Sequence, residues 1–328
     1  MTQTTSSRLT SLDDIRTAAE RIKPVARVTP LVDVSEAARR PLFLKAENLQ
    51  PVGAFKVRGA YNMVAQLSPG QRQAGVITYS SGNHGQAMAL AARALGAPAV
   101  VVMPTSAPAV KIDGARALGA EVILEGTTSV ERRIRAEAEA AARGLTMVPP
   151  FDHEWIIAGQ GTAGLEILEQ LPGVAAVVVP IGGGGLVAGV AAAIKQSKPD
   201  VVVIGVEPSG AAAMRASVDA GEPITLAKTA TVADGLMPVR PGDLTFAHVR
   251  AFVDGVVIVE DPDIIEAVLW IFTHAHLVAE PSGAAATAAV LTGVVDGLVP
   301  ANRPVVAIVS GGNVAPERLA EFKAATIR

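Results

Sequence analysis

Short apolar runs alternate with longer Ala-rich stretches of helical spacing along almost the whole chain. Runs rich in Val and Ile are typical of buried strands, and strands that alternate with helices predict parallel sheets built from βαβ units. The sequence therefore predicts an α/β protein. Strands are expected over Leu42–Lys45, Gly75–Tyr79, Ala99–Met103, Glu121–Leu124, Ala176–Val179, Val201–Val206, Val256–Val259 and Val305–Val309.

Capping residues and proline-containing turns divide this pattern. Ser11 is expected to cap the first helix after a disordered stretch over residues 1–10. A second helix is expected over Ser129–Arg143, with Ser129 as its N-cap and Gly144 at its end. Turns at Asn48–Val52 and Pro149–Asp152 predict a small domain of residues 51–149 inserted into a large domain of residues 1–50 and 150–328.

Composition narrows the functional classes. The 328-residue chain is 50% apolar and has a net charge of −3, which gives no indication of a nucleic-acid-binding surface. It has no cysteine, so it has neither disulfides nor a catalytic thiolate, and a cytoplasmic location is expected. The first ten residues are polar and resemble no signal peptide. Residues 171–194 carry no charge, but Pro180 and four glycines interrupt them, so we predict a strand, a loop and a helix and no association with a membrane.

Lys56 is the first candidate for chemistry. It lies in the run Gly53-Ala54-Phe55-Lys56-Val57-Arg58, where we expect a strand to give way to a helix. A desolvated lysine can form a Schiff base with a carbonyl compound, including pyridoxal phosphate. A single lysine is more often an ordinary surface residue, so the hypothesis depends on the other motifs.

The second candidate is the glycine run Gly182-Gly183-Gly184-Gly185, which follows a Val-rich strand and precedes an Ala-rich helix. Glycines let backbone N–H groups approach an anion, and a helix N-terminus favours negative charge, so the run predicts a phosphate site. A nicotinamide dinucleotide is an alternative ligand. The spacing of Gly183, Gly185 and Ala188, with Glu207 ending the next expected strand, fits the loose dinucleotide fingerprint and would make the protein an NAD-dependent oxidoreductase.

Two further polar runs follow expected strands. Ser80-Ser81-Gly82-Asn83-His84 combines hydroxyls, an amide and a helix start, which could hold a carboxylate and hydrogen-bond a ring oxygen. Ser310 follows the last strand, at the carboxyl end where ligands of open α/β sheets bind. Each run alone is more typical of an ordinary helix cap or loop.

Taken together, these runs resemble the fold-type II pyridoxal-phosphate enzymes, specifically the threonine/serine dehydratase and serine racemase family. The resemblance covers nearly the whole chain and implies two open, mostly parallel sheets flanked by helices. It rests on Val28-Thr29-Pro30-Leu31, Lys45-Ala46-Glu47-Asn48-Leu49-Gln50, Phe55-Lys56, Ser80-Ser81-Gly82-Asn83-His84-Gly85, Ala158-Gly159-Gln160-Gly161-Thr162, the four glycines, Ala233-Asp234-Gly235, Ala279-Glu280-Pro281-Ser282-Gly283 and Ser310-Gly311-Gly312-Asn313.

The resemblance implies a role for each matching position. Lys56 would carry pyridoxal 5'-phosphate as a Schiff base and act as the catalytic base. The remaining cofactor contacts would come from Phe55, Asn83, Gly182, Gly183, Gly184, Gly185, Leu186, Gly235 and Ser310. The substrate carboxylate would be surrounded by Ser80, Ser81, Gly82 and His84, with Ser81 as a second catalytic residue.

The implied activity is that of a dehydratase or ammonia-lyase acting on L-threonine and/or L-serine, and the alternative on the same scaffold is an amino-acid racemase. The family also implies an amino-acid substrate and a homo-oligomer, either a dimer or a tetramer. A divalent or monovalent cation would bind at Glu207 and the Ala211 carbonyl, but the third ligand position is Ala213, which weakens this site. Ala54 stands where the family usually has Ser, which leaves room for a bulkier substrate side chain.

Overall fold

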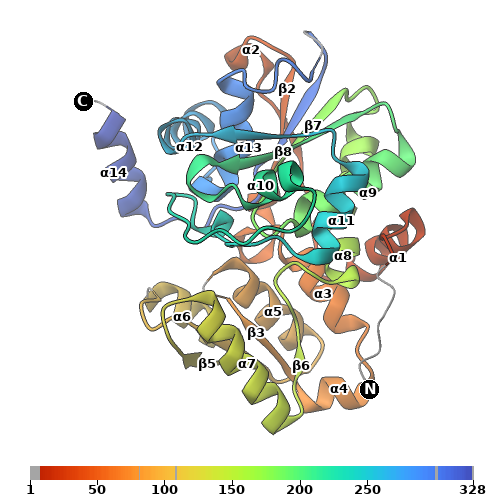
Figure 1. The fold of residues 1–328 in the computed structure, drawn as a ribbon, viewed down its shortest axis with the longest axis vertical. Helices are drawn as coiled ribbons and strands as arrows, with labels where there is room; N and C mark the ends of the chain where they lie inside the picture. The colour runs from red at the N-terminus through yellow and green to blue at the C-terminus, as the bar shows by residue number, and fades with distance from the viewer. Residues whose placement is uncertain (1–7, 81, 108, 300–301, 327–328) are drawn as a thin grey trace.

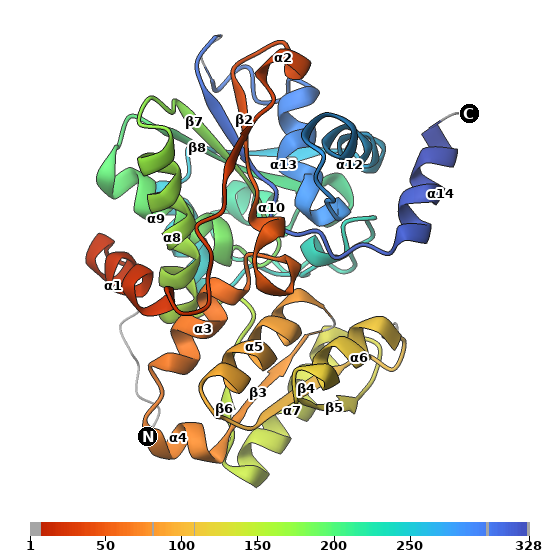
Figure 2. The same cartoon turned by 180° about the vertical axis from the view of Figure 1, so that it is seen from behind.

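The computed structural model describes residues 8–80, 82–107, 109–299 and 302–326. Within these residues the strands form two sheets, which lie one above the other with α3 (Val57–Ala65) and α8 (Glu154–Gln170) at their junction (Figure 1, Figure 2). Every strand pair is parallel except the first pair of the larger sheet. The expectation of two mostly parallel sheets flanked by helices is confirmed.

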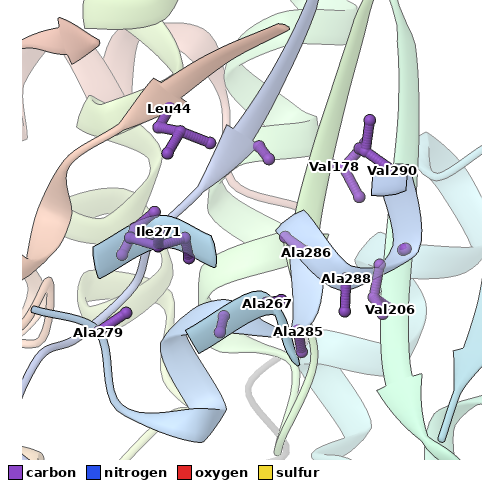
Figure 3. Packing of buried hydrophobic residues seen from close by; sticks show 14 of the residues in the cluster. Leu44, Val178, Val206, Ala267, Ile271, Ala279, Ala285, Ala286, Ala288 and Val290 are labelled. Carbon is purple, nitrogen blue, oxygen red and sulfur yellow. The ribbon is translucent and has the colours of Figure 1, made fainter. Parts of the chain in front are cut away.

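The large sheet has six strands and buries both of its faces. Its order is β1 (Leu31–Asp33), β2 (Leu42–Lys45), β10 (Val305–Ile308), β7 (Ala176–Pro180), β8 (Val202–Pro208) and β9 (Gly255–Val259). Alternate side chains point to opposite faces. Val178 and Val206 pack on one face against α12 (Asp261–Ala275) and α13 (Pro281–Leu291) (Figure 3). Val177 and Val203 pack on the other face against α8, α9 (Gly185–Ser197) and α11 (Asp243–Phe252).

The small sheet has four strands in the order β5 (Glu121–Leu124), β4 (Ala99–Met103), β3 (Val76–Tyr79) and β6 (Thr146–Met147). Val101 packs on one face with residues of α3 and α5 (Asn83–Ala94), and Val100 packs on the other with Ala136 of α7 (Ser129–Arg143). Each sheet thus lies between helices, and no strand joins the two sheets among the described residues. The domain boundaries at residues 50/51 and 149/150 agree with this division but stay a prediction.

The remaining elements include helices that pack on other helices, such as α1 (Leu12–Ile22) on α8 and α14 (Pro316–Thr326) on α12. The others are α2 (Ser35–Ala38), α4 (Pro69–Ala74), α6 (Ala109–Ala117), α10 (Ala213–Ala220) and the 3-10 turns η1 (Glu47–Leu49), η2 (Pro51–Gly53), η3 (Ser209–Ala211) and η4 (Asp234–Leu236). Among the described residues, no helix has both the length and the apolar character needed to cross a membrane.

Two glycines fix the junction between the sheets. A Cβ atom on Gly159 of α8 would lie only 2.6 Å from the Cα atom of Gly59 on α3. The two helices therefore pack backbone against backbone, which a side chain at either glycine would prevent. Because Lys56 lies immediately before α3, this close contact fixes where the lysine is placed.

All of the expected strands are present, but the two-residue β6 and three-residue β1 were missed because they lack an apolar run. The predicted cap at Ser129 is wrong, since the Thr128 hydroxyl accepts the bond from the Glu131 N–H and forms the capping box. The expectation of disorder is wrong for residues 8–10. The Thr10 N–H donates to His248 Nε2 at 2.8 Å, and Thr10 is buried. Residues 1–7 lie outside the described part of the chain.

Candidate active site

The loop that carries Lys56 is attached to the carboxyl end of β10. The Phe55 N–H donates to the Ser310 carbonyl at 3.1 Å, and the Gly312 N–H donates to the Gly53 carbonyl at 2.9 Å. Ala54 and Gly311 form an antiparallel bridge between these two bonds. The lysine loop and the end of the last strand therefore form one local unit, although more than 250 residues separate them in the sequence.

Lys56 directly precedes α3, but the expectation of a strand before it is wrong, because η1 and η2 separate β2 from the lysine. Its ammonium donates to the Pro150 carbonyl at 2.8 Å and lies 5.1 Å from the centroid of the Phe55 ring. The side chain keeps some contact with solvent. Burial nevertheless lowers the pKa of Lys56 to about 8, because the surrounding protein disfavours the charged form. An amine with this pKa is neutral far more often than an ordinary lysine.

The four glycines connect β7 to α9 and leave no room for side chains. A Cβ on Gly182 would lie 2.8 Å from the Gly235 carbonyl oxygen, and one on Gly183 would overlap the Phe151 ring. Gly184, the N-cap of α9, has φ +97°, a conformation that favours glycine. Gly185 begins α9, and the next side chain, Leu186, packs into the core. Because the first N–H groups of a helix have no partner within it, this turn can accept an anion.

Asn83 begins α5 and is held from two sides. Its Nδ2 donates to Glu280 Oε1 at 2.6 Å, and its Oδ1 accepts from Asn313 Nδ2 at 2.8 Å. Glu280 is buried, and burial followed by the charge of Asp234 raises the pKa of Glu280 to about 7. The amide of Asn83 is therefore fixed in one orientation, and one of its two N–H groups has no acceptor among the described residues.

Ser310 and Gly235 lie on either side of Ser282. The Ser310 hydroxyl donates to the Ser282 carbonyl at 3.4 Å, and the Gly235 N–H donates to the Ser282 hydroxyl at 2.8 Å. Ser282 belongs to the first turn of α13, so this helix end links the end of β10 to η4. Ser310 is buried.

Ser80, Gly82 and His84 follow β3, and Ser81 lies outside the described residues. The Ser80 N–H continues the sheet by donating to the Val102 carbonyl at 3.1 Å. Gly82 caps α5. The His84 side chain is buried, with Nε2 3.1 Å from the Val148 carbonyl and no hydrogen-bond partner at Nδ1 among the described residues. Burial, followed by the charge of Lys56, lowers the pKa of His84 to about 3, so this imidazole is neutral.

Glu207 does not face an open site. Its two carboxylate oxygens accept the N–H groups of Met214 and Arg215 at 2.8 and 2.7 Å and so cap α10. Burial raises the pKa of Glu207 to about 7. The described residues contain no cluster of three or more acidic or His side chains that could hold a metal. A cation at Glu207 and the Ala211 carbonyl stays a prediction. The ribose contact that the dinucleotide alternative assigned to Glu207 is not accessible, because this side chain is fully buried and its oxygens cap α10.

Pro150, Phe151 and Asp152 complete the site. The sequence pattern predicted only a turn at a domain boundary here and did not indicate their contacts. The Pro150 carbonyl accepts a hydrogen bond from the Lys56 ammonium, and the Phe151 ring packs against Gly183 of the glycine turn. The Asp152 carboxylate accepts the N–H groups of Asp243, Leu244 and Thr245 at 3.0–3.1 Å and so caps α11. No local signal identifies these roles, because each partner is distant in the sequence.

Comparison with known protein families identifies the chain. A family model described as "Pyridoxal-phosphate dependent enzyme" matches residues 22–311. The chain belongs to this family. Membership confirms the resemblance seen in the sequence and overturns the alternative of an NAD-dependent oxidoreductase.

Three relatives show which pyridoxal-phosphate enzymes the chain is similar to. It is 44% identical over 307 residues to the L-threonine ammonia-lyase of Thermotoga maritima, a match that covers 93% of this chain and 76% of the relative. The processed threonine deaminase isoform 2 of Solanum lycopersicum is 38% identical with a TM-score of 0.90, covering 97% and 95% of the two chains. Maize serine racemase is 36% identical with a TM-score of 0.91 and 98% coverage of each chain. The chain is thus similar to both lyases and a racemase.

Proposed function

We propose that this protein is an ammonia-lyase that converts L-threonine and/or L-serine to a 2-keto acid and ammonia. The observation that carries the proposal is the Lys56 amine, whose pKa is lowered to about 8 and which donates to the Pro150 carbonyl, next to the Phe151 ring that packs on the glycine turn. The T. maritima ammonia-lyase, 44% identical to this chain, supports the same reaction.

The residues fit pyridoxal phosphate. Gly182 to Gly185 and the Leu186 N–H would hold the phosphate, because side chains are excluded there and the start of α9 favours an anion. The free N–H of Asn83 would donate to the ring hydroxyl. Phe55 and Gly235 would lie against the ring, and the Ser310 hydroxyl would contact the ring nitrogen. When bound, the cofactor withdraws electrons from the substrate Cα.

Lys56 has two tasks in this proposal. It would hold the cofactor covalently, and its amine, when not so bound, would accept the proton from the substrate Cα. A base works best when its pKa lies near the operating pH, and burial moves Lys56 in that direction. The β-hydroxyl would leave as water by taking up one proton, which balances the proton removed from Cα, and hydrolysis of the eliminated product would give the 2-keto acid and ammonia.

Ser310 and the loop at the start of α5 would determine which reaction follows. A neutral hydroxyl at the ring nitrogen does not enforce protonation of the ring as a carboxylate would, which favours elimination over transamination. The substrate carboxylate would lie at Ser80, Ser81, Gly82 and the His84 backbone, near the N-terminus of α5. This placement keeps the Cα–H bond aligned toward Lys56.

Racemisation is the second candidate, and the similarity to maize serine racemase favours it. It requires an acid on the face opposite Lys56, a role that only Ser81 is proposed to fill. Ser81→Ala would then abolish racemisation and leave elimination from one enantiomer.

We expect L-threonine or L-serine to give equal amounts of keto acid and ammonia, with no D-amino acid. A keto-acid assay beside chiral chromatography separates the two reactions. Phenylserine is included in the panel because Ala54 leaves space beside the lysine. Formation of neither a keto acid nor an inverted amino acid from β-hydroxy amino acids would overturn the proposed function.

The pH dependence of cofactor attachment tests Lys56 separately from turnover. Only the neutral amine attacks an aldehyde, so the attachment rate should rise with pH and level off above about 8, the lowered pKa of Lys56. An unperturbed lysine would level off only near pH ~10.4. The measurement adds pyridoxal phosphate to cofactor-free protein and follows the visible absorption of the Schiff base. A rate that still rises roughly ninefold between pH ~8.5 and pH ~9.5, as the neutral fraction of an unperturbed lysine does, would contradict the assignment.

A further inference from the structure

An ion pair connects a helix beside the small sheet to a turn beside the large sheet. Lys111 lies on α6, which packs beside the small sheet, and its ammonium is 2.9 Å from Asp234 Oδ2. Asp234 begins η4, which packs against α13 of the large sheet. The Lys111 side chain is 22% exposed and that of Asp234 is 58% exposed, so the pair adds little to stability. Stability therefore does not explain why Lys111 and Asp234 are paired at this place in the fold.

The Lys111 ammonium also lies beside the start of α5. A Cβ atom on Gly82, the N-cap of α5, would be 3.7 Å from Lys111 Nζ. On the other side, Asp234 precedes Gly235, whose carbonyl oxygen approaches Gly182 of the glycine turn. The ammonium thus lies between the segment proposed to hold the substrate carboxylate and the edge of the proposed phosphate site.

The surrounding charges require a cation when an anion enters. Glu280 lies close enough for Asp234 to raise its pKa and for Lys111 to lower it, so these three groups share one electrostatic environment. A carboxylate bound near Gly82 would add negative charge beside Asp234 and Glu280. Lys111 is placed to balance this charge, and like charges without it would repel.

We propose that Lys111 is a substrate-recognition residue whose ammonium exchanges Asp234 for the carboxylate of the amino-acid substrate. This inference rests on the proposed function, since it takes the substrate to be an amino acid bound at the start of α5. Asp234 holds the ammonium when no substrate is bound and competes with the substrate for it. The two halves of the pair therefore have opposite effects on substrate binding.

The test measures the Kd of L-alanine for the holoenzyme by titration calorimetry. L-Alanine carries the carboxylate but has no β-hydroxyl to eliminate, so its affinity does not depend on which reaction the enzyme performs. We expect Lys111→Met and Lys111→Gln to raise the Kd about tenfold, the loss of one charge-assisted hydrogen bond, and Lys111→Arg to stay close to the parent. Asp234→Asn should lower the Kd, because the competing carboxylate is removed.

Lys195→Met is the matched control. Lys195 forms a similar pair with Asp254 at 2.7 Å on the large sheet, away from the site, and its loss should leave the Kd unchanged. If the pair only fastened the two sheets together, Lys111→Met and Asp234→Asn would weaken binding alike, and that result would overturn the proposal. An unchanged Kd in Lys111→Met and Lys111→Gln would also overturn it. A parent enzyme that binds no amino acid would instead refute the proposed function, and the inference with it.

Discussion

Replacing Lys56 with alanine should lower turnover of L-threonine by at least about 10³-fold. In the proposed function the change would remove both the covalent link to the cofactor and the base that accepts the Cα proton, and the loss of a general base alone costs roughly 10²–10⁴-fold. Turnover is measured as keto acid formed per enzyme. Borohydride reduction of the parent enzyme, followed by peptide mass spectrometry, should place the cofactor on Lys56.

Lys198→Ala is the matched control for this prediction. The Lys198 ammonium also donates to a proline carbonyl, that of Pro172 at 2.7 Å, but it is exposed and far from the glycine turn. Its loss should leave turnover unchanged. A reduced adduct on any other lysine, or a Lys56→Ala variant that keeps most of its turnover, would contradict the assignment of Lys56.

Replacing Arg58 with methionine should destabilise the protein by about 3–5 kcal/mol, because it leaves buried carboxylates without their partner. Arg58 is fully buried and binds Glu47 through two bonds of 2.7 Å and Glu166 through bonds of 2.6 and 2.8 Å. Lys45, the other buried cation of this cluster, donates to Glu166 at 2.6 Å. The cluster joins η1, α3, α8 and β2, and Arg58 lies two residues after Lys56 in the chain. Its loss should therefore loosen the lysine loop as well.

The measurement is urea-induced unfolding followed by circular dichroism. Arg318→Met is the control, since Arg318 and its partner Glu321 are both more than half exposed, and we expect a change of less than about 1 kcal/mol. Arg58→Lys should fall between the two, because lysine keeps the charge but loses the paired geometry of the guanidinium. An Arg58→Met variant as stable as the control would show that the cluster contributes only weakly.

The local features of the site could be predicted from the sequence because each depends on neighbouring residues. The glycine turn, Asn83 and Ser310 each follow an apolar run, and each of these runs forms a buried strand. Even here, short-range geometry decided details. Thr128 rather than Ser129 caps α7, because only Thr128 is placed to form the reciprocal bonds with Glu131. The motif order also carried the family resemblance, which the family match confirmed.

The sequence by itself determined eight of the ten strands in the described residues, their alternation with helices, the glycine turn and Lys56 as a candidate nucleophile. Only the tertiary structure decided that the Pro150 carbonyl accepts a hydrogen bond from Lys56 and that the Phe151 ring packs on the glycine turn. It also decided that Lys111 forms an ion pair with Asp234. Lys56 and Pro150 are 94 residues apart in the sequence, and Lys111 and Asp234 are 123 residues apart. Hydrophobic spacing encodes which residues are buried in an element, but it does not encode the order of the strands in a sheet. Because that order brings distant loops together, the contacts that lower the pKa of Lys56 and surround the site emerge only when the chain folds.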